Sequence, residues 1–498
     1  MHLPANKRHN LLKAIKMKKY IIALVFLFII FNLINFILPL TVNAKAKQST
    51  FSVVRNKNAR PNITKNGVYN VNRAVRQALK NNDLIKSAVQ RVKAAQANFS
   101  ADTAGMLPKL SFNYNASRME YQPYLQTSHV PIPTFNLSGG KNGYMYFPPR
   151  IYMNSDTNFN WSLQITQPVF TGFALLDKRE LAKIGINISR VQKQEAVLNV
   201  IEGVKVAYFN VLRAQEQLKV AGEQVKSLKS HEIQAKLLYK QGVIPYNDLL
   251  KSEVALADAV QYKTSSKSAL NIAVSNFNTV LNQNINAKDR FKNIRYVNFK
   301  SYGLSSLFIY ALRHRPGLKI FRFKIKQETL KEKIAESRYY PHVSAFAAYS
   351  QSGQNWLAEN NAFNNQENKI IGLSATWTLF NWFKTSDNYQ KEKHEKTALK
   401  YSLKSYINSV RLEVKSDLLN LRTAFKNIKA AKLSVKQAKE NLKITDLQYM
   451  QETTMSTEVL DAETYLKHAE LNYYDSLYGF DIYLARLQRD TGRNNYGE

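Results

Sequence analysis

The chain has 498 residues and no cysteine, and its 71 Lys and Arg residues outnumber 36 Asp and Glu residues, which gives a formal net charge of +35. The lack of cysteine excludes disulfides, thiolate metal sites and a lipid-bearing N-terminal cysteine. Such a basic balance is typical of nucleic-acid-binding proteins, but the N-terminus argues against that class.

The first 44 residues have the order of a secretory signal peptide: basic, apolar, small. Six basic residues precede an apolar run from Tyr20 to Leu40, and Ala44 and Ala46 follow as cleavage positions. Met17 is an alternative start. An uncleaved anchor is the alternative to cleavage, because the run is long enough to span a bilayer. Removal of residues 1–44 leaves a net charge of +29. An exported chain does not normally meet nucleic acid, so we expect the excess charge to face anionic lipid headgroups or solvent.

Paired motifs predict an internal duplication. "LPKLSFNYNAS" (107–117) recurs 233 positions later as "YPHVSAFAAYS", whereas "ITQPVFTGF" (165–173) and "YKQGVIPYNDLL" (239–250) recur 210 positions later as "ATWTLFNWF" and "YMQETTMSTEVL". The difference of 23 residues falls in 123–150, whose Pro, Gly and aromatic residues predict a long external loop. We expect a signal peptide (1–44), a first repeat (45–283), a linker (284–305) and a second repeat (306–498). Each repeat would hold two strands and a helix pair.

Four stretches alternate apolar and polar residues with a period of two. They begin near Leu110, Phe159, His342 and Ile371, and the third is ambiguous because Phe346 falls on its polar side. Such stretches fit bilayer-spanning strands with a polar lumen, although half-buried strands of soluble proteins give the same pattern. Four strands cannot close a barrel, and an open sheet edge is not tolerated in lipid. Spanning strands therefore predict an obligate oligomer.

A long helix is predicted in the second half, because neither Gly nor Pro occurs from Leu373 to Tyr478. A helix from about 385 to 451 would be ~100 Å long. The corresponding helix of the first half has a less regular apolar stripe, because Glu232 falls on one of its apolar positions. Periodicity alone also fits a periplasmic or surface coiled-coil structural protein without channel activity. The apolar seam of the second-half helix steps by four and three residues, through Ala431, Val435, Ala438, Leu442, Thr445 and Tyr449.

In order, spacing and duplication, these motifs resemble the TolC-type outer-membrane efflux proteins (outer-membrane factors), from about Ala74 to Gly492. The resemblance implies a mixed α+β membrane protein. Its long α-helical coiled-coil tunnel would join four transmembrane β-strands per chain, which complete a twelve-stranded barrel in a homotrimer. It also implies a passive exit duct in the outer membrane of a Gram-negative cell, extending into the periplasm. The duct would work with a periplasmic adaptor and an inner-membrane pump or ABC exporter, in multidrug efflux or type I secretion.

The resemblance assigns a pore constriction to Glu458 and Asp461, within "TEVLDAETYL". Three copies would place six carboxylates around one axis, and such a ring favours cations over anions. Without the resemblance, the sequence favours the alternative that the two acids only complement a helix N-terminus.

Further contacts implied by the resemblance lie near the same helix ends. The aromatic gate position falls on Tyr449, with Asp248 as its expected acceptor, although a Tyr packed in the helix seam is an equal alternative. The basic gate position falls on Thr454, so a charged latch is missing there. The adaptor contact falls on Gln241, Gly242 and Val243, whereas the second-half counterpart lacks the glycine.

Catalytic signatures are not visible in the sequence. We find no phosphate-binding loop, metal cluster or nucleophile–base pair, and the eight His residues are scattered. We therefore expect no enzyme activity, no cofactor, no metal and no nucleic-acid partner. Energy for transport would come from the inner-membrane partner.

Overall fold

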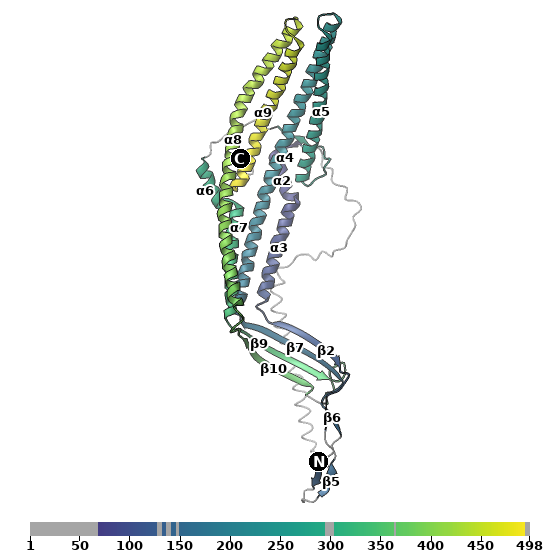
Figure 1. Ribbon diagram of the computed structural model, residues 1–498, viewed down its shortest axis with the longest axis vertical. Helices are drawn as coiled ribbons and strands as arrows, with labels where there is room; N and C mark the ends of the chain where they lie inside the picture. Colours follow the sequence, from purple (N-terminus) through teal and green to yellow (C-terminus); the bar gives the residue numbers. More distant parts are fainter. Residues whose placement is uncertain are drawn as a thin grey trace. The chain divides into compact units, whose positions relative to one another are not determined.

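The computed structural model describes residues 68–126, 132–135, 141–145, 149–293, 303–362 and 365–493. The predicted signal peptide (1–44) and part of the predicted linker lie outside these residues. All elements described below belong to one compact unit within residues 64–498. Within it, a β-sheet lies at one end of the helices, and the turns that join α4 to α5 and α8 to α9 lie at the other (Figure 1).

The main sheet has four antiparallel strands in the order β10-β9-β7-β2. They are β2 (Lys109–Arg118), β7 (Thr157–Phe170), β9 (His342–Gly353) and β10 (Glu367–Thr376). These match the four stretches predicted from alternation. The predicted loop at 123–150 is not irregular throughout, because β3 (Tyr124–Gln126) pairs with β6 (Arg150–Tyr152) and β4 (Ile132–Phe135) pairs with β5 (Lys141–Met145). The pairing extends β2 and β7 outward as a long hairpin.

The register of the main sheet separates an apolar face from a polar face. Leu110 lies opposite Ile165, Ile165 opposite Ala347, and Ala347 opposite Ile371. Directly opposed residues point to the same side of a sheet, so these four side chains share one face. The ambiguous Phe346 lies on the other face above Gly372, where an added Cβ would stand 2.9 Å from its ring. A glycine opposite Phe346 thus makes room for an aromatic ring on the polar face.

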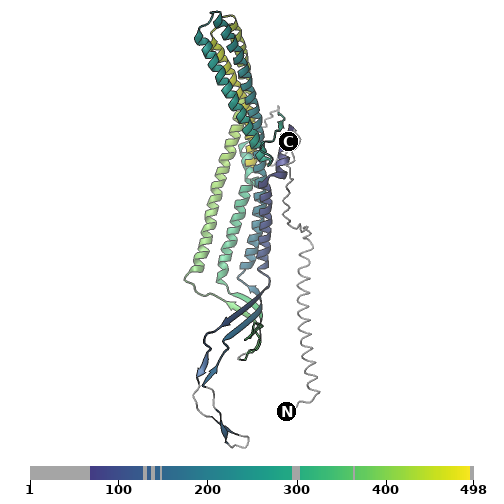
Figure 2. The same cartoon turned by 90° about the vertical axis from the view of Figure 1, so that its right-hand side faces the viewer.

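Two helices of 67 residues, α4 (Ala174–Lys240) and α8 (Lys384–Met450), follow the β7 and β10 strands. The bounds of α8 agree with the predicted helix. Each helix returns through a short turn into a shorter partner, α5 (Tyr246–Val280) and α9 (Ser456–Thr491). The two pairs lie side by side near their turns in Figure 1, and Figure 2 shows the first pair in front of the second; α4 packs along α9.

The remaining helices form two bent segments that pack beside the long ones. α2 (Val71–Asn81) and α3 (Asp83–Ala104) meet at Asn82, whose side chain accepts from the Leu84 amide and donates to the Val280 carbonyl at 2.9 Å each. α6 (Leu304–His314) and α7 (Pro316–Glu336) meet at Arg315, which bonds Glu413 of α8 at 2.5 Å. α3 and α7 pack on either side of α4, in the part of the helices that is nearer the main sheet (Figure 1). Short strands β1 (Val68–Tyr69) and β8 (Arg290–Phe291) pair in parallel.

The buried core lies along the helices rather than in the sheet. One cluster joins α2, α4, α5 and α9 around Tyr208, Phe277 and Tyr478. The Tyr208 hydroxyl donates to the Lys292 carbonyl at 2.6 Å, so this buried polar group is satisfied. A second cluster joins α6, α8 and α9 around Val414 and Leu418. These cores fix the helix pairs that carry the candidate site at the far turns.

Candidate functional site

The two predicted constriction acids lie on one exposed face at the start of α9. Glu458 is in the first turn of the helix, Asp461 is one turn later, and both are exposed. Among the described residues, neither forms an ion pair within 4.0 Å. Glu463 points the other way: it is 4% exposed and accepts a hydrogen bond from Ser227 of α4, and burial raises its pKa. The structure thus separates two solvent-facing acids from a third that joins α9 to α4.

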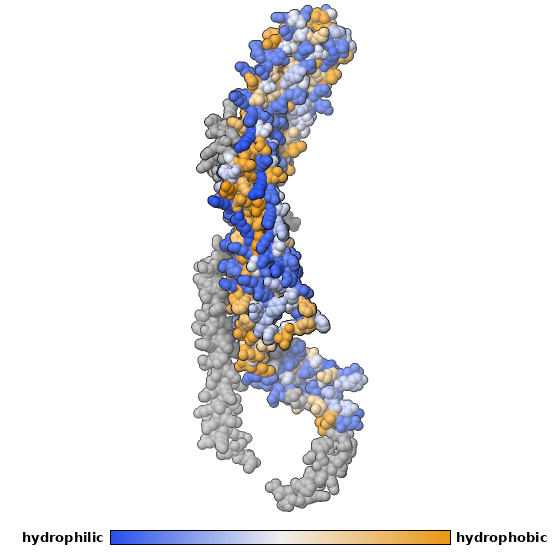
Figure 3. All heavy atoms as spheres, turned by 60° about the vertical axis from the view of Figure 1, so that its left-hand side comes forward, coloured by the Kyte–Doolittle hydropathy of each residue, from blue (hydrophilic) through white to orange (hydrophobic). Residues whose placement is uncertain are grey.

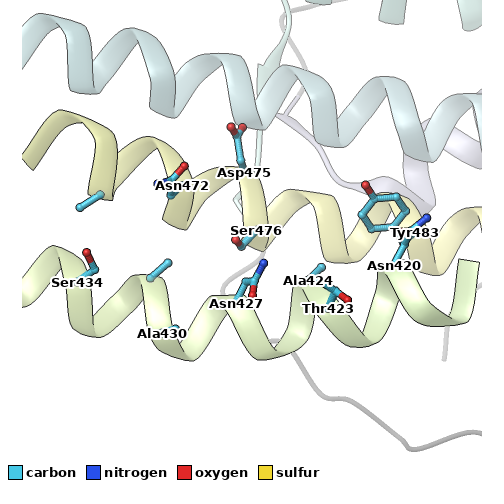
Figure 4. A pocket seen from close by; sticks show the side chains of 12 residues that line it. Asn420, Thr423, Ala424, Asn427, Ala430, Ser434, Asn472, Asp475, Ser476 and Tyr483 are labelled. Carbon is cyan, nitrogen blue, oxygen red and sulfur yellow. The ribbon is translucent and has the colours of Figure 1, made fainter. Parts of the chain in front are cut away.

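The exposed face that begins with Glu458 and Asp461 continues along α9 through Tyr465, His468 and Asn472. Asn472 lines a polar groove of about 520 Å³ between α8 and α9 (Figure 4). Asn, Ser, Thr and Ala dominate its lining, and the side chain of Asp475 turns toward α4, where it accepts from Gln217 at 3.3 Å. This face of α9 is therefore polar from its acidic end to the groove.

Tyr449, the predicted gate aromatic, is a packed core residue in the single chain. It is 1% exposed and contacts a small cluster with Leu238 and Val459. Its pKa is raised, first by burial and also by the charge of Asp248. Ser456 lies near its hydroxyl and lowers the pKa in part, but no hydrogen bond of good geometry to that hydroxyl forms among the described residues, and Asp248 pairs instead with Lys251 at 3.3 Å. Asp248 is thus close to Tyr449 without the expected hydrogen bond, and the gate role of this pair stays a prediction.

His231 of α4 is a part of this region that the sequence reasoning missed. Its Nε2 lies 2.8 Å from the Ser456 hydroxyl of α9, and its ring centroid is 4.8 Å from that of Tyr449. The side chain is 4% exposed, and burial lowers its pKa to about 4. His231 therefore ties the first helix pair to both helices of the second pair as a neutral imidazole. The available signal in the sequence was the neighbouring Glu232, a charged residue at an apolar position of this helix. Glu232 is also buried, and its carboxylate accepts from Lys229 at 2.9 Å.

Acidification is expected to weaken this joint. The pKa of His231 is about 4 in the fold and about 6.5 when free, so the stability gained from the neutral form is present above pH 6.5 and is lost as pH falls toward 4. The gap corresponds to about 3 kcal/mol, or roughly a hundredfold in an opening equilibrium. We expect amide protection of the α8–α9 turn, corrected for intrinsic exchange, to fall by up to that factor between pH 7.5 and pH 4.5.

His231→Gln keeps a hydrogen-bonding side chain but cannot titrate, so its protection should change little over the same pH range. His468→Gln removes an exposed histidine of α9 and is the matched control, which should behave as the wild type. Equal pH dependence in all three proteins would show that another group carries the effect.

The predicted adaptor-contact residues form the end of α4. The amide of Gly242 donates to Tyr239 at 2.9 Å and that of Val243 donates to Leu238 at 3.0 Å, which is a Schellman ending. Gly242 has φ of +75°, the left-handed conformation that glycine adopts without penalty. α8 ends in the same pattern, with Glu452 at φ of +60° in place of the glycine, and Thr454 is half-buried just beyond it.

Glu452→Gly is expected to stabilise the α8 turn by about 1 kcal/mol, because it removes a side chain from a left-handed backbone position. The reciprocal Gly242→Glu should weaken the α4 turn by a similar amount. An added Cβ at Gly242 meets nothing within 4 Å, so backbone strain alone would account for the loss of stability. The measurement is amide exchange at Thr453 and Val243, with about a fivefold change in protection in opposite directions. Unchanged exchange in both variants would show that a side chain at this left-handed turn position causes no backbone strain.

The described residues contain no group of three or more His, Cys, Asp or Glu side chains that could hold a metal ion. Among the same residues, no helix has the length and apolar character needed to cross a membrane.

A family model for outer membrane efflux proteins matches residues 74–283 and 309–493. No curated protein matches. Among solved structures, the chain is similar to the Campylobacter jejuni outer membrane channel CmeC, with 18% identity, a TM-score of 0.69 and 85% of both chains covered. It is also similar to the Vibrio cholerae outer membrane protein VceC, with 13% identity, a TM-score of 0.67, and 85% of this chain and 96% of that one covered.

The open state of the Neisseria gonorrhoeae MtrE outer membrane channel is a third similar structure, with 17% identity and a TM-score of 0.65, covering 85% of this chain and 89% of that one. At these identities the structures establish the fold, which is mostly helical with a smaller sheet, as in outer-membrane channels. The family match covers well over half of the sequence. The chain therefore belongs to the outer membrane efflux protein family, and its place is the outer membrane, from which it extends into the periplasm.

Proposed function

We propose that three copies of this chain form a passive trans-periplasmic exit duct, with one twelve-stranded barrel in the outer membrane. The observation that carries the proposal is the main sheet, whose outer strands β2 and β10 each pair on one side only among the described residues. Phe112 of β2 and Ile371 of β10 are 63% and 89% exposed on the apolar face. Joining β2 of one copy to β10 of the next would close the sheet and turn this face to lipid.

The helices support the same assembly. α8 carries large exposed apolar side chains along its length, and Figure 3 shows apolar patches among the charged residues on one face of the helices. Exposed apolar patches of this kind mark interaction surfaces, and we assign them to packing between protomers. These side chains of α8 are Tyr401, Leu412, Leu419, Phe425, Leu433, Ile444, Leu447 and Met450.

We infer that the chain is an internal duplication with the domain limits given by the sequence motifs: a signal peptide (1–44), repeats over 45–283 and 306–498, and a linker (284–305). The equal lengths of α4 and α8, and the shared ending of these helices, support this inference. Glu458 and Asp461 are exposed and have no ion-pair partner in the part of the chain that the structure describes, which supports a constriction at the α9 turn. Tyr449, Asp248 and Thr454 are the proposed gate contacts.

The proposed partners are a periplasmic adaptor and an inner-membrane protein. The α4 turn at Gln241, Gly242 and Val243 is exposed, as an adaptor contact requires. A periplasmic adaptor would connect the duct to an inner-membrane pump or ABC exporter that supplies the energy. The cargo would be drugs in multidrug efflux or polypeptides in type I secretion.

Reconstitution in planar bilayers tests the duct. We expect the purified protein to remain trimeric in mild detergent, to cofractionate with outer membrane and to form ion-conducting channels. A protein that is extracted by salt alone, without detergent, and forms no channels would instead be the coiled-coil structural protein.

A further inference from the structure

A groove of about 590 Å³ lies where α3, α4 and the start of α7 meet the end of α9, away from the acidic turn of α9. Its floor is apolar: Leu198 and Pro316 are buried, and three half-buried valines complete it. The valines are Val89, Val92 and Val197. A floor of this kind offers contact area to an apolar ligand body.

The rim of this groove is basic. Lys93 of α3, Arg190 and Lys193 of α4, and Lys319 of α7 line it together with His314, and no acidic residue does. The imidazole of His314 stacks on Tyr310 at 4.0 Å, with Arg493 over the same ring. α7 begins here with no acidic residue in its first turn, so this helix end adds no compensating charge.

Charge compensation is missing at this rim and present nearby on the same helices. Lys86 of α3 pairs with Asp83 at 2.8 Å, Lys183 of α4 with Glu180 at 3.5 Å, and Lys331 of α7 with Glu328 at 2.8 Å. Within the described part of the chain, none of the four rim cations has a carboxylate within 4.0 Å. Solvated lysines spread over a helix face would not require an explanation. Here, however, four cations without a carboxylate partner in the described residues come from three helices and surround one apolar floor. This clustering requires an explanation.

We propose that this groove binds a phosphate monoester that carries an apolar body. Like charges at one rim raise the free energy of the empty groove, and a dianion relieves that repulsion. The guanidinium of Arg190 can bind two phosphate oxygens in parallel, and the lysines add point charges. The apolar body lies on the valine floor, where its burial adds affinity that a bare anion lacks. The proposal goes beyond the exit duct and does not depend on it.

The test titrates the whole protein, purified in a nonionic detergent, by calorimetry with three probes: inorganic phosphate, phenyl phosphate and dihexanoyl phosphatidic acid. We expect phenyl phosphate to bind at least tenfold more tightly than inorganic phosphate. Tighter binding of the short-chain lipid than of phenyl phosphate identifies a lipid headgroup as the source, and the reverse identifies a soluble ester. Either order supports the groove.

Matched variants locate the binding. Lys93→Gln/Lys319→Gln removes two rim charges from α3 and α7, and we expect it to weaken phenyl phosphate binding at least tenfold. Arg91→Gln/Lys324→Gln removes two exposed charges from the same helices outside the groove and should weaken it less than twofold. Val92→Ser should weaken phenyl phosphate binding and leave inorganic phosphate binding unchanged.

The proposal is overturned if the two double variants bind phenyl phosphate alike, because binding would then follow total charge. It is also overturned if inorganic phosphate binds as tightly as phenyl phosphate, because the apolar floor would then contribute nothing. Size-exclusion chromatography of each variant confirms that the assembly is retained before titration.

Discussion

Replacement of Ile371 by arginine is expected to abolish assembly in the outer membrane, whereas the same replacement of its neighbour Ile370 is expected to be tolerated. The two residues are adjacent in β10 and identical in type, but they point to opposite faces of the sheet. Ile371 lies opposite Ala347 on the apolar face, and Ile370 lies opposite Ala348 on the polar face. An arginine on a lipid-facing strand position costs about 2–4 kcal/mol near the bilayer midplane.

Three copies in one barrel would bring this cost to roughly 6–12 kcal/mol, comparable to the whole stability of a typical folded domain. The measurement is the amount of detergent-resistant trimer in the outer-membrane fraction. Ile371→Arg should leave little or none, and Ile370→Arg should leave close to the wild-type amount, with its guanidinium in an aqueous lumen. Equal recovery of both variants would contradict the proposed lipid-facing side of the sheet.

The strands and long helices could be predicted from the sequence because their signals are local. Alternation with a period of two identified all four strands of the main sheet, and the run without Gly or Pro placed α8 within one residue of its observed bounds. The end of β7 was harder to predict from the sequence. It extends to Phe170 through Pro168, where the register against β9 shifts. The ambiguity at Phe346 needed the identity of its cross-strand partner, Gly372, which alternation does not supply.

The candidate site was only partly predictable, because its contacts join positions far apart in the chain. Helical spacing places Glu458 and Asp461 on one face and Glu463 on another, but it does not say which face is buried, because the partner of Glu463, Ser227, is 236 residues away. His231 and Ser456 are 225 residues apart, so the joint between the helix pairs depends on how α4 crosses α9. The basic groove likewise needs three helices at once, and no single segment of the sequence contains its pattern.

Neutralisation of the exposed acids is expected to remove the cation preference of the channel. Glu458→Gln/Asp461→Asn deletes two carboxylates per chain, and therefore six around the axis of a trimer, while it keeps the size and hydrogen-bonding capacity of both side chains. Both residues are exposed and unpaired among the described residues, so the change should not disturb packing. A ring of acids at a constriction concentrates cations and repels anions.

The measurement is the reversal potential of single channels in planar bilayers under a salt gradient. We expect the cation-to-anion permeability ratio of the double variant to fall at least fivefold toward unity. The difference from wild type should be largest at low ionic strength, where the Debye length reaches ~30 Å at 0.01 M. High salt should diminish the contrast, because screening weakens the field of the six carboxylates.

The matched control, Glu440→Gln/Glu452→Gln, removes the same two charges per chain from exposed positions, one on α8 and one in the turn that follows it. It should keep most of the cation preference, since a constriction responds to the charges at its narrowest point more than to the total charge of the chain. A double variant of α9 that retains the full preference would move the constriction away from Glu458 and Asp461. An equal loss in both double variants would instead assign the selectivity to the overall field of the helix ends, because the two proteins carry the same net charge and differ only in the positions of the removed acids.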